Sequence, residues 1–242
     1  DLVIFNTCSI RAKAEQKFLS ELGRIKSLKQ EKPSLRIAVT GCIAQQMGEK
    51  LFKKAPYVDY ILGPQNIDKV SNVIDSPNRV RLAFNDNNPG LEVLELPALR
   101  KDKGRAWVNI MYGCNNFCSY CIVPYTRGRE RSRPAESIIR EVENLAAEGF
   151  KEVTLLGQNV NSYNSLLPPL TKGGRGGGGF PGLLKNINNI TGIERVRFVT
   201  SHPRDLTAEL VEWMAVLDKV CEHIHLPLQS GSSKTLSLMN RG

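Results

Sequence analysis

The sequence predicts an α/β protein in which an N-terminal parallel-sheet domain is followed by part of a β/α barrel. Short apolar runs alternate with amphipathic helical patterns over most of the 242 residues. Strands that alternate with helices in this way form parallel sheets with helices on their faces. Asn, Asp and Pro interrupt the pattern over residues 75–104, where we expect a linker. The expected domains are therefore residues 1–100, which include the linker, and residues 101–242.

The N-terminal domain is expected to hold a Rossmann- or flavodoxin-like sheet. Apolar strand patterns occupy residues 2–6, 36–40 and 60–63, and an edge strand is expected at 79–84. A long helical pattern follows the first strand and a shorter one, at 44–54, follows the second. This order is that of doubly wound parallel sheets.

Cys8 and Cys42 each come directly after one of the first two predicted strands. The carboxyl ends of parallel strands lie at one edge of a sheet, and ligands bind beyond that edge. We therefore expect these cysteines to serve one site. The alternative is that each is a small buried apolar residue, which is a common role for free cysteine.

The second half of the chain repeats a strand followed by a helix, which indicates part of a β/α barrel with its active site at the carboxyl ends of the strands. The expected strands are 106–111, 152–156, 195–200 and 223–226, and the expected helices are 134–149, 183–190, 208–217 and one that starts at 232. Residues 164–182, rich in Gly and Pro, are expected to form a mobile insertion. Four strands cannot close a barrel. Because the chain also begins without Met, we interpret it as an internal fragment truncated at both ends.

The strongest single motif is Cys114, Cys118 and Cys121 at the spacing C-x3-C-x2-C. Thiolates hold iron–sulfur clusters, and three on a short loop reach three corners of one four-iron cluster and leave one iron open. Zinc is the alternative, and it prefers four Cys or His ligands, usually supplied as two pairs. The sequence offers no second pair, because the next cysteine is Cys221. The pattern therefore favours the cluster.

Composition limits the class of protein and suggests a partner. The formal net charge of +9 favours a polyanionic partner, nucleic acid first. No apolar run is long enough to span a membrane, and no signal peptide is recognisable. Six cysteines, half of them clustered, fit metal binding in a reducing compartment better than a disulfide framework. We expect a cytoplasmic protein with no membrane partner.

The cysteine triplet and its surroundings resemble the radical S-adenosylmethionine (AdoMet) enzymes, in which the residue before the last cysteine, here Tyr120, is typically aromatic. Further segments narrow the resemblance to the radical AdoMet methylthiotransferases. These segments are 6–11, 40–42, 112–121, 124–128, 132–134, 156–161, 200–203 and 225–232. The similarity runs over nearly the whole chain, since the segments are distributed from residue 6 to residue 232. The last three resemble the members that act on N6-isopentenyladenosine in tRNA more than those acting on a ribosomal protein or on threonylcarbamoyl adenosine.

The resemblance implies two [4Fe–4S] clusters. Cys114, Cys118 and Cys121 would hold the radical cluster, whose open iron binds AdoMet. Cys8 and Cys42 would hold an auxiliary cluster that supplies sulfur, together with an upstream cysteine that this sequence lacks. The small RNA-binding β-barrel domain that ends the family's chains is missing as well, and truncation is the simplest explanation for both.

Polar residues at the predicted carboxyl edge of the barrel are expected to contact AdoMet, in addition to Tyr120. They are Gln158, Asn159, Ser201, His202 and Gln229. The alternative is that each bonds loop backbone, the commoner role of such residues.

The implied reaction uses AdoMet twice, once to methylate sulfur at the auxiliary cluster and once as a radical source. The radical removes hydrogen from C2 of an isopentenylated adenosine next to the anticodon, and a methylthio group replaces it. No catalytic side chain beyond the cluster ligands is expected, because an aromatic C–H bond is too weak an acid for general base catalysis.

The expected partners are the anticodon stem-loop of tRNA and an electron donor such as flavodoxin or ferredoxin. Alternating arginines after the cysteine triplet are expected to hold RNA phosphates, although a solvated charged loop is the alternative. They are Arg127, Arg129, Arg131 and Arg133. Two other functions stay open: methylthiolation of a ribosomal protein or of threonylcarbamoyl adenosine, and a noncatalytic iron–sulfur or zinc RNA-binding module.

Overall fold

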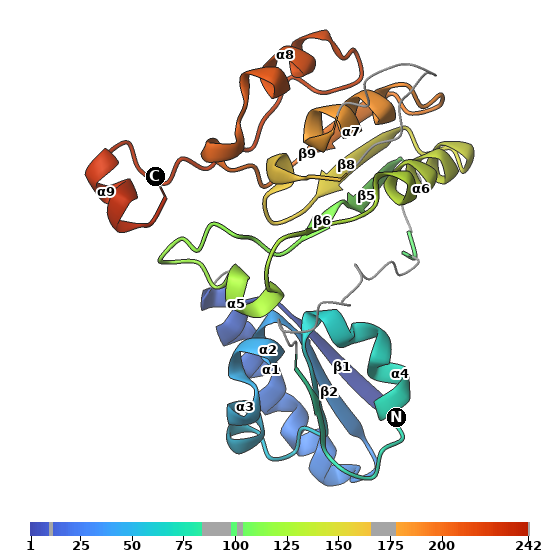
Figure 1. Cartoon of the computed structure of the whole chain (residues 1–242). Helices are drawn as coiled ribbons and strands as arrows, with labels where there is room; N and C mark the ends of the chain where they lie inside the picture. The colour runs from blue at the N-terminus through green and yellow to red at the C-terminus, as the bar shows by residue number, and fades with distance from the viewer. Residues whose placement is uncertain (10–11, 84–97, 101–103, 166–177, 242) are drawn as a thin grey trace. The chain divides into compact units, whose positions relative to one another are not determined.

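The computed structural model describes residues 1–9, 12–83, 98–100, 104–165 and 178–241 (Figure 1). Contacts between residues divide the chain into two units. The first unit comprises Asp1–Leu96 with Tyr120–Gly128, and the second comprises Pro97–Ser119 with Arg129–Gly242. Much of the predicted linker and most of the Gly-rich insertion lie outside the described residues.

The first unit is built on a parallel sheet in the order β1-β2-β3-β4. Its strands are β1 (Leu2–Thr7), β2 (Arg36–Gly41), β3 (Tyr60–Leu62) and β4 (Val80–Leu82). Its helices are α1 (Ala12–Glu31), α2 (Cys42–Met47), α3 (Glu49–Lys54), η1 (Pro64–Lys69), α4 (Val70–Val73) and α5 (Val123–Arg127). The parallel-sheet prediction for this domain is confirmed.

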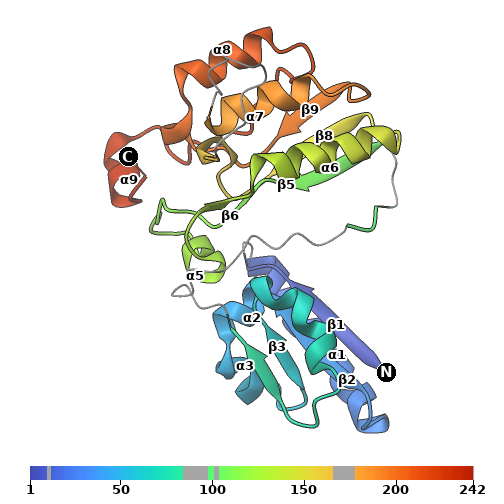
Figure 2. The same cartoon turned by 45° about the vertical axis from the view of Figure 1, so that its right-hand side comes forward.

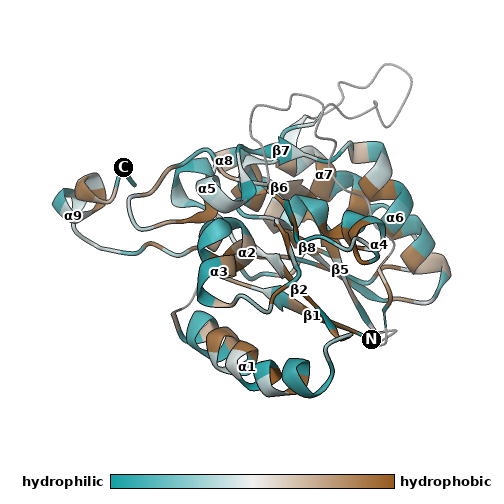
Figure 3. Cartoon of the chain, turned by 90° about the horizontal axis from the view of Figure 1, so that it is seen from below, coloured by the Kyte–Doolittle hydropathy of each residue, from teal (hydrophilic) through white to brown (hydrophobic). Residues whose placement is uncertain are grey.

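Both faces of this sheet are buried, as parallel sheets require. Ile37 and Val39 of β2 belong to an apolar cluster with residues of α1, α2 and α3. Ala38, between them, belongs to a separate cluster with Val73 of α4. Figure 1 shows α4 on one side of the strands and α2 and α3 on the other, and Figure 2 shows α2 and α3 beside β3. Figure 3 shows brown and teal residues alternating around α1, as expected for a helix with one buried face.

The second unit holds a parallel sheet in the order β5-β8-β9. Its strands are β5 (Arg105–Asn109), β8 (Glu152–Leu156) and β9 (Arg195–Phe198), with a separate antiparallel pair of β6 (Met111–Tyr112) and β7 (Arg131–Ser132). Its helices are α6 (Ala135–Ala147), η2 (Val160–Ser162), α7 (Gly179–Asn188), η3 (Pro203–Asp205), α8 (Ala208–Val216) and α9 (Ser233–Leu238). The successive strand and helix pairs of a partial β/α barrel are thus present.

One apolar core joins this sheet to its helices. Val108, Val153 and Val196, from the three strands, are all fully buried. They share a cluster with Ile138 of α6 and Leu183 of α7. Burying such side chains stabilises the unit by roughly 1.5–3 kcal/mol each relative to exposure.

The strand expected at 223–226 is wrong. Within the described part of the second unit, β9 is extended instead by a single bridge from Val196 to Val220. The backbone N–H of Val196 donates to the Lys219 carbonyl at 2.7 Å, and the Cys221 N–H donates to the Val196 carbonyl at 3.0 Å. The chain therefore pairs with β9 at Val220, in the turn after α8. The apolar alternation at residues 223–226 does not determine where this pairing occurs.

Gly41 provides the close approach between β1 and β2 at their carboxyl ends. Its φ of +92° and ψ of −158° lie in a region that is essentially restricted to glycine. A Cβ at this position would collide with the carbonyl oxygen of Thr7, its partner in the register. The sheet edge that carries Cys8 and Cys42 therefore depends on a glycine.

We predict that Gly41→Ala lowers the free energy of unfolding by roughly 1–3 kcal/mol from backbone strain, with more from the collision. Urea denaturation followed by circular dichroism measures the change. Gly23→Ala is the matched control, because nothing lies within 4 Å of a Cβ built at this helical position. That variant should gain roughly 0.5–1 kcal/mol. Equal stability of the two variants would contradict the assignment.

Candidate metal centre and cofactor site

Cys8 and Cys42 lie at neighbouring strand ends of the first sheet. The register pairs Thr7 with Gly41, the last residues of β1 and β2, and each cysteine is the next residue along the chain. Cys42 begins α2 and is buried, whereas Cys8 is exposed. The hydroxyl of Thr7 donates to the Thr40 carbonyl at 2.5 Å and ties the two strand ends together. The expected common edge is therefore present, and whether these thiols bind a metal stays a prediction.

The loop that carries Cys114 and Cys118 begins directly after β6. Gly113 has a φ of +77° and Phe117 a φ of +47°, so the chain turns sharply on both sides of Cys114. The Gly113 N–H donates to Oε1 of Gln158 at 2.7 Å. Asn116 Nδ2 lies 3.6 Å from Cys114 Sγ and donates toward it. Cys118 is buried and Cys114 is half-buried.

Residues after α9 hold this loop from a distant part of the chain. The Ser119 N–H donates to the Met239 carbonyl at 2.9 Å. Asn240 Nδ2 donates to the Phe117 carbonyl at 3.1 Å. Arg241 Nη1 lies 3.5 Å from Cys118 Sγ. The conformation of the loop therefore depends on more than its own sequence.

A buried polar cluster lies at the carboxyl ends of β8 and β9. Asn159, Ser201 and His202 are 2%, 4% and 7% exposed. Each keeps one buried polar atom without a hydrogen-bond partner in the described structure: Asn159 Oδ1, Ser201 Oγ and His202 Nε2. Such atoms are rare in folded proteins and cost roughly 1–3 kcal/mol each when unpaired. A polar ligand with donors and an acceptor would satisfy all three.

The remaining polar atoms of this cluster are fixed by neighbours. Asn159 Nδ2 donates to Asp205 Oδ2 at 2.6 Å. Asn161 accepts from the His202 N–H at 2.8 Å and donates to its carbonyl at 2.9 Å. His202 Nδ1 accepts from the Arg204 N–H at 3.2 Å, so the neutral ring carries its proton on Nε2. The unpaired Nε2 is therefore a donor.

Burial lowers the pKa of His202, and Arg241 and Arg204 lower it further, while Asp205 opposes them. The folded state therefore favours the neutral imidazole. A neutral donor at this position suits a ligand group that accepts hydrogen bonds.

The other expected AdoMet contacts are placed less directly. Gln158 bonds loop backbone through its Oε1, which is the alternative considered above for such residues. Gln229 is exposed and has a φ of +69°. Tyr120 is 50% exposed and belongs to the first unit. Of the expected AdoMet contacts, the structure therefore brings only Asn159, Ser201 and His202 together in the buried polar cluster.

The expectation that Arg133 holds RNA phosphate is wrong. Its side chain is buried, with Nη1 donating to the Asn109 carbonyl and to Glu141 Oε2, each at 2.7 Å. Nη2 donates to the Ser137 hydroxyl at 2.9 Å. Arg133 therefore joins the end of β5 to α6. Arg129 lies over the Phe117 ring, 4.5 Å from its centroid, beside the cysteine loop.

Sequence reasoning missed several site residues. Asp205, Asn240 and Arg241 carry no local motif, and only the tertiary contacts above identify them. Glu130 is another. Burial raises the pKa of its carboxyl, the hydrogen bond with Ser162 opposes this, and nearby Asp205 raises it further. In the sequence Glu130 lies among alternating arginines, which was the one signal for a functional role of this residue. The same pattern indicates an exposed charged loop equally well.

The donor chemistry fits an iron–sulfur cluster, although the described conformation does not preassemble one. Among the described residues, no group of three or more His, Cys, Asp or Glu side chains is arranged to hold a metal ion. The six cysteines are free thiols. N–H donors reach the sulfurs of Cys114 and Cys118, and such donors are what cluster-bound thiolates accept.

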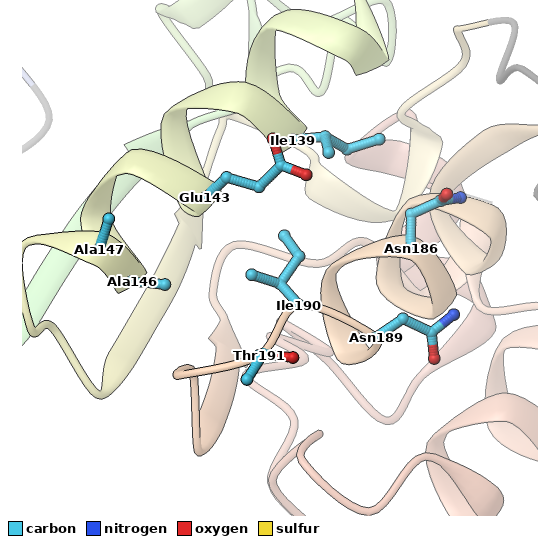
Figure 4. Close-up of a pocket in the computed structure, with 8 residues that line it drawn as sticks. All are labelled: Ile139, Glu143, Ala146, Ala147, Asn186, Asn189, Ile190 and Thr191. Atoms are coloured by element: carbon cyan, nitrogen blue, oxygen red, sulfur yellow. The ribbon is translucent and has the colours of Figure 1, made fainter.

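A cavity of about 540 Å³ lies elsewhere, between α6 and α7 (Figure 4). Its lining residues are Ile139, Glu143, Ala146, Ala147, Asn186, Asn189, Ile190 and Thr191. None of these is a candidate ligand or cofactor contact, and Glu143 is the single ionisable group among them. We attribute no chemistry to this cavity.

The fold and the cysteine loop define a class of protein, an α/β protein with a thiol-rich loop at the carboxyl edge of a parallel sheet. The family model described as "Radical SAM superfamily" matches residues 108–242, and one described as "Uncharacterized protein family UPF0004" matches residues 1–63. The chain belongs to the radical SAM superfamily, in which SAM is the molecule called AdoMet above.

Curated relatives match along the whole chain. One from Thermodesulfovibrio yellowstonii is 57% identical over 241 residues, 100% of this chain and 53% of its own length. One from Syntrophus aciditrophicus is 51% identical over 247 residues and one from Moorella thermoacetica is 50% identical over 246 residues. Each is named tRNA-2-methylthio-N(6)-dimethylallyladenosine synthase. The chain spans about half the length of these relatives.

A solved structure shares the fold. The radical S-adenosylmethionine methyltransferase TsrM from Kitasatospora setae, solved with cobalamin and a [4Fe-4S] cluster bound, aligns with a TM-score of 0.60 at 15% identity. The alignment covers 98% of this chain and 51% of that one. At this identity the likeness concerns the fold alone.

The helices in the described part of the chain include none that is both long and apolar enough to cross a membrane.

We predict that His202 makes stability depend on pH. Because the pKa of His202 is lowered from 6.5 in the folded state, the unfolded state binds more protons as the pH falls below that value. The stabilisation is present above pH 6.5 and is lost as the pH falls from 6.5 through the lower pKa of the folded state. His202→Asn keeps an acceptor for the Arg204 N–H and removes the titration, so it should flatten the change in unfolding free energy between pH 7.5 and 5.5.

Urea denaturation at several pH values checks this slope. His223→Asn, at an exposed histidine, is the matched control and should behave like wild type. An unaltered slope in His202→Asn would contradict the electrostatic account of this side chain.

Proposed function

We propose that the chain is part of a radical AdoMet tRNA methylthiotransferase that adds a methylthio group to C2 of N6-isopentenyladenosine next to the anticodon. The observation that carries the proposal is 57% identity, over the full chain, to a relative whose name states this product. Membership of the radical SAM superfamily supports the same chemistry.

Two groups of cysteines supply the thiols that the proposal needs. Cys114, Cys118 and Cys121 would hold a [4Fe–4S] cluster through three thiolates and leave one iron open. Their spacing, their free thiols and the donors toward two of the sulfurs support this assignment. Cys8 and Cys42 would be ligands of a second cluster, and their position at adjacent strand ends supports a shared role.

AdoMet would be held at the carboxyl ends of β8 and β9. The unpaired Oδ1 of Asn159 is an acceptor, and the unpaired Ser201 hydroxyl and His202 Nε2 are donors. This set matches the polar groups of a nucleoside and an amino acid. When bound, the cluster and AdoMet supply the one-electron chemistry that replaces an unreactive C–H bond. The side chains of this protein would bind and orient AdoMet. We propose Tyr120, Gln158 and Gln229 as further contacts to AdoMet.

The proposed partners are tRNA and a one-electron donor such as flavodoxin or ferredoxin. The net charge of +9 favours an RNA partner. Arg129, over the Phe117 ring beside the cysteine loop, is a candidate for stacking or phosphate contact. Arg133 is excluded from this role because its guanidinium pairs with Glu141.

We predict that cells whose gene is disrupted lose 2-methylthio-N6-isopentenyladenosine and accumulate N6-isopentenyladenosine. Mass spectrometry of digested tRNA measures both nucleosides. Complementation with the intact gene should restore the mark, and complementation with the gene carrying Cys118→Ala should lower it at least about a hundredfold, because a cluster ligand is lost. The gene carrying Cys221→Ala is the matched control and should restore the mark.

Persistence of the 2-methylthio mark, together with loss of a methylthio group from a ribosomal protein or from threonylcarbamoyl adenosine, would assign the protein to the other substrates. Persistence of all three marks would favour the noncatalytic module.

A further inference from the structure

Residues 238–241, which follow or end α9, contact the cysteine loop through several independent hydrogen bonds. The Leu238 and Met239 carbonyls accept from the side chain and main chain of Ser119, at 3.4 and 2.9 Å. Asn240 Nδ2 donates to the Asn116 carbonyl at 3.4 Å and to the Phe117 carbonyl at 3.1 Å. We call these residues the 238–241 segment.

Arg241 is the member of this segment that reaches a thiol. Its Nη1 lies 3.5 Å from Sγ of Cys118, which is 7% exposed. Its Nη2 donates to the Pro227 carbonyl at 2.5 Å. The two contacts use both terminal nitrogens, so the guanidinium is fixed beside the sulfur. A positive charge is thus held against a buried thiol that the sequence motif singles out.

We propose that Arg241 is a positioning residue that raises the reduction potential of the iron–sulfur cluster by donating a hydrogen bond, with its positive charge, to the Cys118 thiolate. The inference rests on the proposed function, because it takes Cys118 to be a cluster ligand. It adds a residue that the cysteine motif does not contain, about 120 positions further along the chain.

The physical reason is the charge that reduction adds. One electron enters the cluster from an external one-electron reductant, and the guanidinium keeps its proton throughout. A positive charge and an N–H donor at a sulfur stabilise the more negative, reduced form over the oxidised one. The low exposure of Cys118 limits screening by water and strengthens this effect.

Arginine suits this position better than lysine. The planar guanidinium donates in two directions at once, to the Pro227 carbonyl and to the sulfur. A lysine would keep the charge but has one ammonium group, which would not be held in the same place. Arg241→Lys should therefore lie between wild type and a neutral variant.

The test is a potentiometric titration of the anaerobically reconstituted chain, with the reduced cluster measured by electron paramagnetic resonance (EPR) and iron counted per chain. In Arg241→Met we expect the ratio of reduced to oxidised cluster at a fixed potential to fall about tenfold, which is about 59 mV for one electron. Arg241→Lys should show a smaller fall. Arg140→Gln, which removes an exposed charge on α6, should match wild type.

Asn240→Gly separates loop support from the effect on the sulfur. It removes both amide hydrogen bonds while glycine tolerates the φ of +51° found there. The potential of this variant should stay at the wild-type value. If Arg241→Met does not load iron, the comparison of Arg241→Lys with Asn240→Gly decides the question instead.

Different failures have different meanings. An unchanged potential in cluster-loaded Arg241→Met overturns this inference alone, and weaker AdoMet binding in that variant would then assign Arg241 to the AdoMet carboxylate. A wild-type chain that binds no cluster overturns the proposed function, and the inference with it. A lower potential in Asn240→Gly equal to that of Arg241→Met overturns the role of the guanidinium.

Discussion

Parallel strand pairing is the constraint on which both candidate sites depend. Because a helix returns the chain to the opposite edge after each parallel strand, every loop that leaves a strand begins at the same edge of its sheet. In the first unit this places Cys8 and Cys42 directly after the last register pair, Thr7 and Gly41. In the second unit it places the loops that carry Asn159 and His202 side by side after β8 and β9. The chemistry-bearing residues gather there because helices cover the sheet faces.

The buried polar atoms at that edge have a cost that the apolar core offsets. Asn161 bonds the His202 backbone on both sides, and Asp205 fixes the Asn159 amide. These bonds hold the side chains in orientations in which three polar atoms stay unpaired. A folded protein tolerates such atoms where a ligand will pair with them. The same logic explains Arg133, whose charge is buried only because Glu141 and a carbonyl receive it.

The sequence predicted the fold class and most strands because apolar periodicity is a local signal, and the strand expected at 152–156 coincides with β8. The strand predicted at 223–226 was wrong, because the chain pairs with β9 at Val220, in the turn after α8, and local alternation does not reveal this. The expectation for Arg133 was also wrong, since an alternating arginine pattern does not reveal that Glu141 lies opposite it. Arg241 was missed for the same reason: its contact with Cys118 joins residues far apart in the chain.

The proposed chemistry requires three loop thiols and an iron that stays open to AdoMet. The most direct measurement is the EPR spectrum of the anaerobically reconstituted, reduced chain, recorded before and after AdoMet is added. We predict a [4Fe–4S]⁺ signal whose shape changes with AdoMet, and loss of that signal when Cys114, Cys118 and Cys121 are all replaced by alanine. A spectrum that does not change when AdoMet is added would contradict the proposed open iron. A signal that stays unchanged when all three loop cysteines, Cys8 and Cys42 are replaced would contradict the proposed cluster ligands.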